Sequence, residues 1–207
     1  MDGFTLSNSR RSGASGASTR VVDVIIPVHS GLAEVRACLE SLLSSRSELQ
    51  GEVIVINDRS PDPAIDEFLR SLERASRITL LENNQNLGFI KSCNRAAALL
   101  PDNDFILLNA DTEVHGNWLD RMVAHAAAAS DIASITPFSN NATIASYPKG
   151  GARRETPTDI PVAQIDEAMS IANAGESVPL PTAVGFCMWV SRAAWQEVGG
   201  FDERFGR

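Results

Sequence analysis

Short apolar runs alternate with amphipathic segments along most of the chain. The runs are rich in Val, Ile and Leu and predict six strands, at residues 21–27, 52–56, 78–81, 105–109, 132–136 and 185–190. Between them, apolar residues recur at three- and four-residue intervals and predict helices at residues 32–42, 63–72, 89–100, 118–129 and 192–198. This alternation predicts an α/β fold, a three-layer α/β/α sandwich with a mostly parallel central sheet.

Prolines set several boundaries of these elements. Pro27 is expected to end the first strand, because proline has no N–H to donate to a neighbouring strand. Pro63 suits the first turn of the second helix, where an N–H would have no partner. Pro101 is expected to stop the third helix, which follows a turn-rich stretch at residues 83–88.

The composition along the sequence predicts one folded domain after a short leader. Residues 1–20 are rich in Ser, Gly and Arg, so they bury too little apolar surface to fold and form a flexible leader. Residues 21–207 suit a single domain with one core. A polar, Pro- and Gly-rich region from residue 139 to about residue 180 is predicted to be a loop-rich insertion that covers a substrate.

Charge and cysteine usage narrow the class of protein. The 18 Lys and Arg residues against 26 Asp and Glu give a formal net charge of -8, and this acidic balance argues against nucleic-acid binding. The chain has no apolar run long enough to span a membrane and no signal peptide, so any membrane contact is peripheral. Three widely spaced cysteines, Cys38, Cys93 and Cys187, indicate reduced core thiols in a cytoplasmic protein.

Polar residues follow three of the predicted strands at the point where each strand ends. They are Pro27-Val28-His29, Asn57-Asp58 and Asn109-Ala110-Asp111. In a parallel sheet the carboxyl ends of the strands open on one edge, where ligands of α/β proteins bind. We therefore expect these groups to share one crevice that holds a nucleotide.

Asp111 is the predicted metal ligand. With Glu113 nearby it suits Mg²⁺ or Mn²⁺, hard ions that take one or two carboxylates and complete their shell with water and phosphate oxygens. Such an ion would neutralise a departing diphosphate. The alternative is that Asp111-Thr112 caps a helix beginning near Gly116.

Asp58 is the predicted nucleoside ligand, since an ionised carboxylate offers about four acceptor positions to a base or ribose. The alternative is a helix cap or turn residue, because residues 58–62 also have good turn chemistry. Neither GxGxxG nor GxxxxGK[ST] occurs, so the two commonest glycine-rich phosphate loops are excluded. His115 and His125 have no partner at metal-ligand spacing and are interpreted as surface residues.

Taken together, five stretches of the chain resemble glycosyltransferase family 2, the inverting nucleotide-sugar transferases with the GT-A fold. They are residues 24–29 (VIIPVH), 53–58 (VIVIND) with Ser60 and Asp62, 86–89 (NLGF) with Ser92 and Asn94, 107–113 (LLNADTE), and 199–203 (GGFDE). The resemblance implies that Pro27, Val28 and His29 line the nucleotide site and that Asp58 holds the base. Lys91 could reach the donor's phosphates, although a solvated helix face explains it nearly as well.

The resemblance also places Asn109, Ala110 and Asp111 at the family's DxD motif, with Asp111 as the metal-binding end. Asn109 replaces the first aspartate, a version that is similar to the rhamnosyltransferase-like branch. Residues 139–148 resemble a segment that helps shape the donor and acceptor region, and residues 185–190 and 199–202 resemble the acceptor side.

In the family an acidic segment after GGFDE supplies the general base, which must lie within about 3 Å of the attacking hydroxyl. The sequence ends at Arg207 before such a segment, so a partial domain is expected, and Asp202 and Glu203 are the late acidic candidates. The implied function is transfer of a sugar from a nucleoside diphosphate to a glycan or lipid-linked hydroxyl acceptor. The setting would be bacterial cell-surface polysaccharide synthesis, in the cytoplasm or at the inner face of the membrane.

Two other functions stay open at this point. The first is a nucleotide-sugar binding module, or an inactive fragment that lacks the catalytic base. The second is a sugar-phosphate nucleotidyltransferase on a related fold, which is disfavoured because the first strand leads into residues 27–29 and not into a Gly-rich, Arg-containing phosphate loop.

Overall fold

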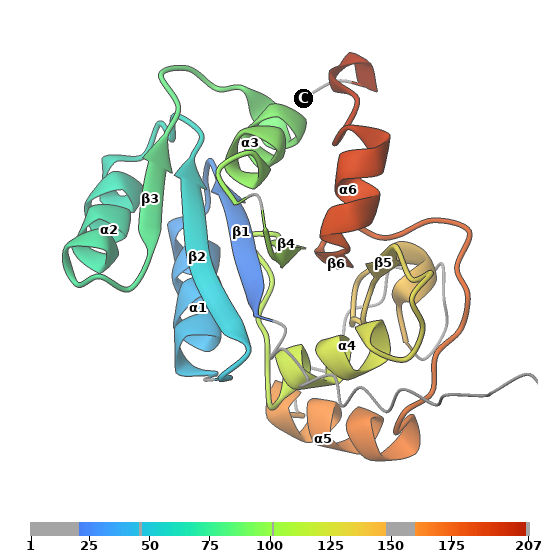
Figure 1. Ribbon diagram of the computed structural model, residues 1–207. Helices are drawn as coiled ribbons and strands as arrows, with labels where there is room; N and C mark the ends of the chain where they lie inside the picture. Colours follow the sequence, from blue (N-terminus) through green and yellow to red (C-terminus); the bar gives the residue numbers. More distant parts are fainter. Residues whose placement is uncertain (1–20, 46, 101, 148–159, 206–207) are drawn as a thin grey trace, which may run out of the picture.

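The computed structural model describes residues 21–45, 47–100, 102–147 and 160–205 (Figure 1). The leader predicted at residues 1–20 lies outside these ranges, as does the predicted helix stop at Pro101. Residues 148–159 of the predicted loop-rich insertion are outside them as well.

A mixed sheet forms the centre of the molecule. Its strands are β1 (Val22–Val28), β2 (Gln50–Asn57), β3 (Thr79–Glu82), β4 (Asp104–Leu108), β5 (Ser134–Ile135) and β6 (Cys187–Val190). They lie in the order β3-β2-β1-β4-β6-β5. The first four run parallel, and β6 runs antiparallel to both of its neighbours. The predicted mostly parallel sheet is confirmed.

Helices cover both faces of this sheet, which confirms the α/β/α sandwich. On one face lie α1 (Leu32–Ser44), α2 (Pro63–Arg74) and α4 (Trp118–Ala126), whose apolar residues join Val24, Ile26 and Val28 of β1. On the other lie α3 (Gly88–Ala97) and α6 (Arg192–Val198), packed against the buried cluster that includes Ile25 and Phe105. Two short 3-10 helices, η1 (Thr143–Ala145) and η2 (Glu203–Phe205), and the outlying helix α5 (Val162–Ala172) complete the described elements.

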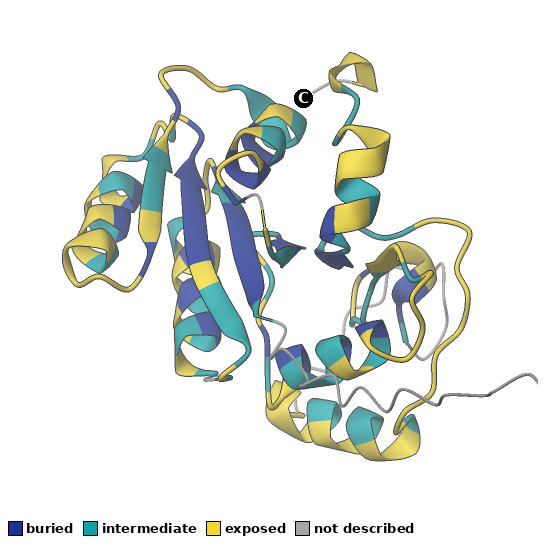
Figure 2. Cartoon of the chain, in the orientation of Figure 1, coloured by how far each residue is buried: buried dark blue, intermediate teal, exposed yellow. Residues whose placement is uncertain are grey.

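Burial on both faces explains why the central strands are nearly continuous apolar runs. Six of the seven residues of β1 are buried, and the carboxyl half of β2 is buried as well (Figure 2). Each fully buried Val, Ile or Leu side chain contributes about 1.5–3 kcal/mol relative to an exposed one. The core therefore lies around β1, β2 and β4, the strands that carry the predicted site at their ends.

Several predicted boundaries differ from the structure. Pro27 lies inside β1, not at its end, because β1 continues to pair with β2 as far as Val28 while its pairing with β4 ends at Ile25. The third predicted helix ends at Ala97 and the fourth at Ala126, each three residues early, and β5 has only two residues. Pro63 begins α2 as predicted, after the N-cap Asp62.

The prediction of loops from residue 139 to about residue 180 was wrong at α5. Ile165 and Met169, four residues apart, turn toward the protein, and residues between them have good helix propensity. An ion pair of 2.5 Å between Arg121 of α4 and Asp166 of α5 connects the two helices, which lie side by side in Figure 1. No residue of α5 is fully buried.

The start of α6 is fixed by a buried cation. Arg192 is 7% exposed, and its guanidinium donates to the backbone oxygens of Asn103 (2.9 Å) and Ala97 (3.2 Å). It also stacks over the ring of Phe105, with 4.6 Å to the ring centroid. Burial lowers the pKa of this guanidinium. These contacts join the end of α3, the start of β4 and the start of α6.

Candidate functional site

The three predicted strand ends lie at one edge of the sheet. Val28 pairs with Asn57 in parallel register, so His29 and Asp58 follow side by side, and the Asp58 N–H donates to the Val28 oxygen at 2.7 Å. β4 lies on the other side of β1. The chain order reverses between β1 and β4, which is the topological switch point at which open α/β sheets bind ligands.

The carboxylate of Asp58 is buried and holds the amino end of α3. Its Oδ1 accepts hydrogen bonds from Asn83 Nδ2 and the Leu87 N–H, and its Oδ2 accepts one from the Gly88 N–H, each at 2.7 Å. Asp58 is only 4% exposed. A negative charge at this position also compensates the helix dipole. Three of its roughly four acceptor positions are thus occupied within the protein.

A chain of polar groups orients the Asn83 amide behind Asp58. Besides its bond to Asp58, Asn83 Nδ2 donates to Ser92 Oγ at 2.9 Å, and its Oδ1 accepts from Arg95 at 2.5 Å. Asn83 and Ser92 are both buried. Because every member has a partner, the network is rigid and keeps the Asp58 carboxylate in one orientation.

His29 is exposed at the same edge and held in one tautomer. Its Nδ1 lies 3.0 Å from the backbone oxygen of Asp58, which can only accept, so Nδ1 carries the proton. Nε2 then acts as the acceptor for Asn86 Nδ2 at 3.1 Å. The pair of His29 and Asn86 presents hydrogen-bonding groups to the solvent beside the buried Asp58.

Asp111 lies in a turn that directly follows β4. The Thr112 N–H donates to the Asn109 oxygen at 3.1 Å, and the Asn109 N–H donates to the Phe186 oxygen at 2.8 Å. Asn109 and Ala110 are half-buried, whereas Asp111 is exposed. Its carboxylate makes no hydrogen bond or ion pair with any other residue that the structure describes, so it is available to a ligand.

The alternative role of Asp111-Thr112 as a helix cap is wrong, because α4 begins at Trp118 with Asn117 as its N-cap residue. The alternative for Asp58 has support, since its carboxylate does cap a helix, although the helix is the distant α3. The thiol of Cys38 donates to the Asn109 oxygen, and burial raises its pKa to about 12, so it supports the turn as a neutral group.

The described residues fit a divalent ion only together with a diphosphate. Among them, no group of three or more His, Cys, Asp and Glu side chains is placed to hold a metal ion. Asp111 offers one carboxylate, and the nearby Glu113 is also exposed. Mg²⁺ and Mn²⁺ suit such a site, because they accept one or two carboxylates when substrate phosphates and water supply the other ligands.

Three other predicted site residues lie on α3 and after α6. Lys91 is exposed on α3, opposite the helix face that carries the buried Ser92, Cys93 and Ala96. Asp202 and Glu203 follow α6, where Asp202 forms an ion pair with Arg204 at 2.5 Å. Hydrogen bonds from Arg204 lower the pKa of Asp202. The resemblance assigned no role to Asn83 or Asn86, although Asn86 begins the resembling NLGF stretch and both residues lie in the turn-rich stretch before α3.

The family model of Glycosyl transferase family 2 matches residues 23–199, so the chain belongs to this family. An uncharacterized glycosyltransferase of Haemophilus influenzae is 27% identical over 105 residues, which is 51% of this chain and 32% of that protein. The matched part thus spans about a third of the length of that relative. None of the helices in the described ranges is long and apolar enough to cross a membrane.

Two solved structures share the fold at low sequence identity. The mannosyltransferase PcManGT from Pyrobaculum calidifontis, in complex with GDP-Man and Mn²⁺, has a TM-score of 0.57 and 16% identity, over 87% of this chain and 47% of its own. GalNAc-T7 with UDP, GalNAc and Mn²⁺ has a TM-score of 0.62 and 16% identity, over 90% of this chain and 38% of its own. These similarities establish a GT-A-like fold.

Proposed function

We propose that this domain transfers a sugar from a nucleoside diphosphate donor to a hydroxyl acceptor, with inversion at the anomeric carbon. The observation that carries the proposal is the exposed carboxylate of Asp111, which follows β4 beside the strand ends that carry His29 and Asp58. Family membership supports the same reading. So do the GDP-Man and UDP complexes of the two proteins that share the fold.

The nucleoside would lie against the ends of β1 and β2. Pro27, Val28 and His29 would line it, and the acceptor position left on Asp58 Oδ2 would take a base N–H. The rigid network around Asn83 keeps this position fixed, so little ordering is needed when the nucleotide binds. Asn86, which is exposed beside His29, would offer a second hydrogen-bonding group to the nucleoside.

The diphosphate would lie at the turn that carries Asn109, Ala110 and Asp111, with Lys91 of α3 as a candidate cation. Asp111 would hold Mg²⁺ or Mn²⁺, which when bound neutralises the negative charge that develops on the leaving diphosphate. The Asn109 amide can donate a hydrogen bond to a phosphate or sugar oxygen but brings no charge. Its replacement of the first aspartate of the DxD motif supports the proposal that the chain belongs near the rhamnosyltransferase-like branch.

A carboxylate must take the proton from the acceptor hydroxyl. Asp202 and Glu203 are the late acidic residues of the described chain, and the ion pair with Arg204 makes Asp202 a weak base. This leaves the exposed Glu203 as the candidate base among the residues that the structure describes. The acceptor would be a glycan or lipid-linked hydroxyl in cell-surface polysaccharide synthesis, in the cytoplasm or at the inner face of the membrane, where the three free, buried cysteines stay reduced.

The same ion pair favours one competing function. If no carboxylate near the acceptor is free to act as a base, the domain binds a nucleotide sugar and does not transfer it. Release of free sugar or of a glycosylated product from the donor distinguishes the enzyme from this binding module.

Calorimetry with UDP and with GDP, each with and without Mn²⁺, tests the proposal. Mn²⁺ is expected to tighten binding of one of the two nucleotides in the wild type, and to have no effect on the Kd of Asp111→Asn, which keeps an oxygen but loses the charge. Asp131→Asn, which removes an exposed carboxylate that has no role in the site, serves as the control and should keep the Mn²⁺ effect. An unchanged Mn²⁺ effect in Asp111→Asn would remove the metal assignment.

A further inference from the structure

The segment after α6 is brought back to the same edge of the sheet as the candidate site. β6 runs antiparallel to β4, from Cys187 beside Leu108 to Val190 beside Phe105, so it leads the chain away from that edge. α6 then runs back toward it and ends beside α3 (Figure 1). Residues 199–203, which we call the return loop, therefore lie at the edge where β1, β2 and β4 end.

Asn94 of α3 holds this return loop with two hydrogen bonds to one residue. Its Nδ2 donates to the Phe201 oxygen at 2.8 Å, and its Oδ1 accepts from the Phe201 N–H at 3.0 Å. A primary amide is the side chain that can satisfy an N–H and a C=O at once. The contact spans 107 residues of sequence.

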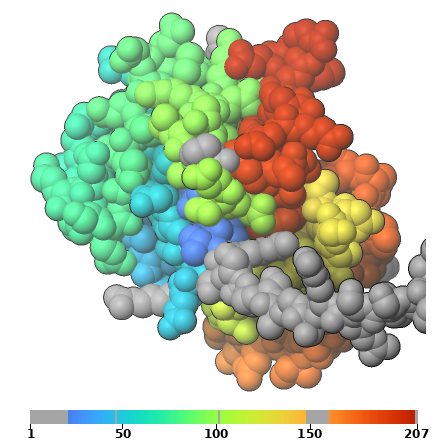
Figure 3. Space-filling view, in the orientation of Figure 1, coloured from blue at the N-terminus to red at the C-terminus, as the bar shows by residue number. Residues whose placement is uncertain are grey.

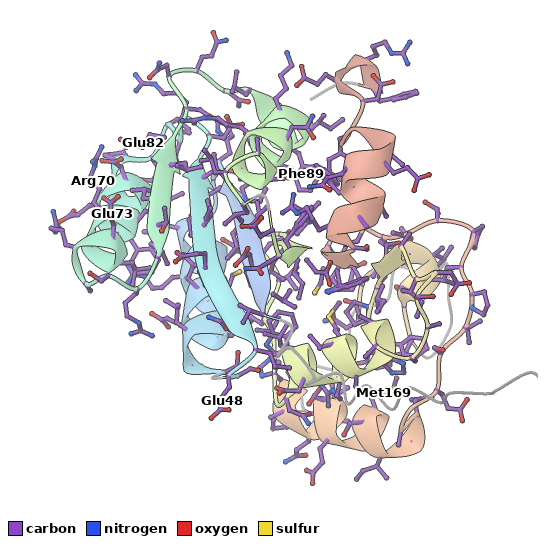
Figure 4. The ribbon with its side chains drawn as sticks, viewed as in Figure 1. Glu48, Arg70, Glu73, Glu82, Phe89 and Met169 are labelled. Atoms are coloured by element: carbon purple, nitrogen blue, oxygen red, sulfur yellow. The ribbon has the colours of Figure 1, made fainter. Side chains whose placement is uncertain are left out.

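Tight packing supports the same contact. Gly199 and Gly200 both have positive φ, 77° and 82°, and a Cβ on Gly200 would lie 3.1 Å from Asn94 Oδ1 and 3.2 Å from Trp195 Cζ2. The Phe201 ring packs edge-on against Trp195, with centroids 5.0 Å apart, and lies 6.1 Å from the ring of Phe89. Figure 4 shows Phe89, at the start of α3, on the side of that helix that faces α6. In Figure 3 the surface of α3 lies against the surface of the C-terminal segment that contains α6.

Helix α3 therefore connects Asp58 to the return loop. The amino end of α3 is fixed by Asp58 through the Gly88 N–H, and Asn94 lies six residues further along, a distance of about 9 Å on an α-helix. Because a helix of this length moves as a rigid unit, the position of the return loop is set relative to Asp58 and not only relative to α6.

We propose that Asn94 is a positioning residue: it fixes the return loop, with Asp202 and Glu203, at a set distance from the donor site. This rests on the proposed transferase function. Both polar atoms of the Asn94 amide are bonded to Phe201, so Asn94 should affect turnover and leave donor binding unchanged.

The test compares Asn94→Leu, which removes both hydrogen bonds, with Asn94→Asp, which keeps the acceptor for the Phe201 N–H. Asn173→Ala on α5 is a matched control, since Asn173 bonds only within its own helix end among the described residues. Gly200→Ala disturbs the same contact from the loop side and replaces Asn94→Leu if that variant does not fold. Circular dichroism checks folding.

Hydrogen exchange of the Phe201 amide is the first measurement. Exchange is expected to be about tenfold faster in Asn94→Leu, faster by a smaller factor in Asn94→Asp, which loses the donor to the Phe201 oxygen, and unchanged in Asn173→Ala. The second measurement uses UDP-GlcNAc and GDP-mannose with Mn²⁺: the Kd of the donor should stay within about twofold of wild type, while kcat for donor hydrolysis falls about tenfold in Asn94→Leu.

Unchanged exchange at Phe201 in Asn94→Leu would show that Asn94 does not hold the return loop. A Kd that weakens in parallel with kcat, or a kcat equal to wild type despite faster exchange, would overturn the positioning role. If the wild type binds neither donor, the proposed function fails and the catalytic role of Asn94 fails with it, whereas the exchange measurement still decides whether Asn94 holds the return loop.

Discussion

The carboxylate of Asp58 and the backbone N–H of Gly88 are joined by a hydrogen bond of 2.7 Å across 30 residues of sequence. This bond ties the end of a central strand to the start of α3. It makes Asp58 a structural residue as well as the proposed nucleoside ligand.

Asp58→Asn is expected to destabilise the protein by about 2–3 kcal/mol, because an amide turns a donor toward backbone N–H groups and loses charge-assisted bonds. Urea denaturation measures the change. Asp62→Asn is the matched control: Asp62 caps α2 through the Ala64 N–H, and Asn is an equally good N-cap residue, so its effect should stay within about 0.5 kcal/mol. Equal losses in the two variants would contradict the special role of Asp58.

The burial of the Asp23 carboxyl predicts an unusual pH dependence of the protein's stability. It is 1% exposed, and burial raises the pKa of its carboxyl above the ordinary value of 3.8, although the Glu52 N–H donates to it at 2.8 Å. Between 3.8 and its raised pKa the folded state binds more protons than the unfolded state, so its contribution to stability is lost as the pH rises through that window.

Asp23→Asn should therefore lose this pH dependence and be at least as stable as wild type at pH 7, since the amide oxygen can still accept from Glu52. Thermal melting from pH 4 to pH 8 measures the effect. The exposed Asp131→Asn provides a control that leaves the slope unchanged. A clear loss of stability at pH 7 in Asp23→Asn would show that its hydrogen bonds outweigh the cost of burying the charge.

Arg192→Lys is expected to cost about 2–3 kcal/mol despite keeping the positive charge. A lysine ammonium cannot reach the oxygens of Asn103 and Ala97 with the geometry of a guanidinium, nor stack on Phe105 as a planar group. Urea denaturation measures the loss. Arg74→Lys, at the exposed end of α2, is the control and should be neutral; a neutral Arg192→Lys would mean that charge alone matters here.

The sequence predicted the order and type of most elements because the buried strands are continuous apolar runs, which have few other interpretations. It failed at α5, where the surrounding Pro and Gly residues outweighed the i,i+4 pair of Ile165 and Met169. It also extended α4 into Ala127 and the residues after it, whose apolar side chains are exposed in the structure. Local pattern does not reveal whether a neighbour exists to bury an apolar residue.

At the candidate site, strand ends were predictable but hydrogen-bond partners were not. The position of Asp58 at the end of a strand follows from local pattern, whereas its contacts with Asn83, Leu87 and Gly88 depend on where α3 packs. The bond of Asn94 to Phe201 joins segments 107 residues apart, and an asparagine within a helix gives no local sign of it.

Helix α5 has a consequence for engineering. Because it buries no residue completely and is connected to α4 through the pair of Arg121 and Asp166, it adds little to the folding free energy of the sandwich. A designer could exchange this helix for another peptide, or graft a tag there, and keep the candidate site at the ends of β1, β2 and β4 intact.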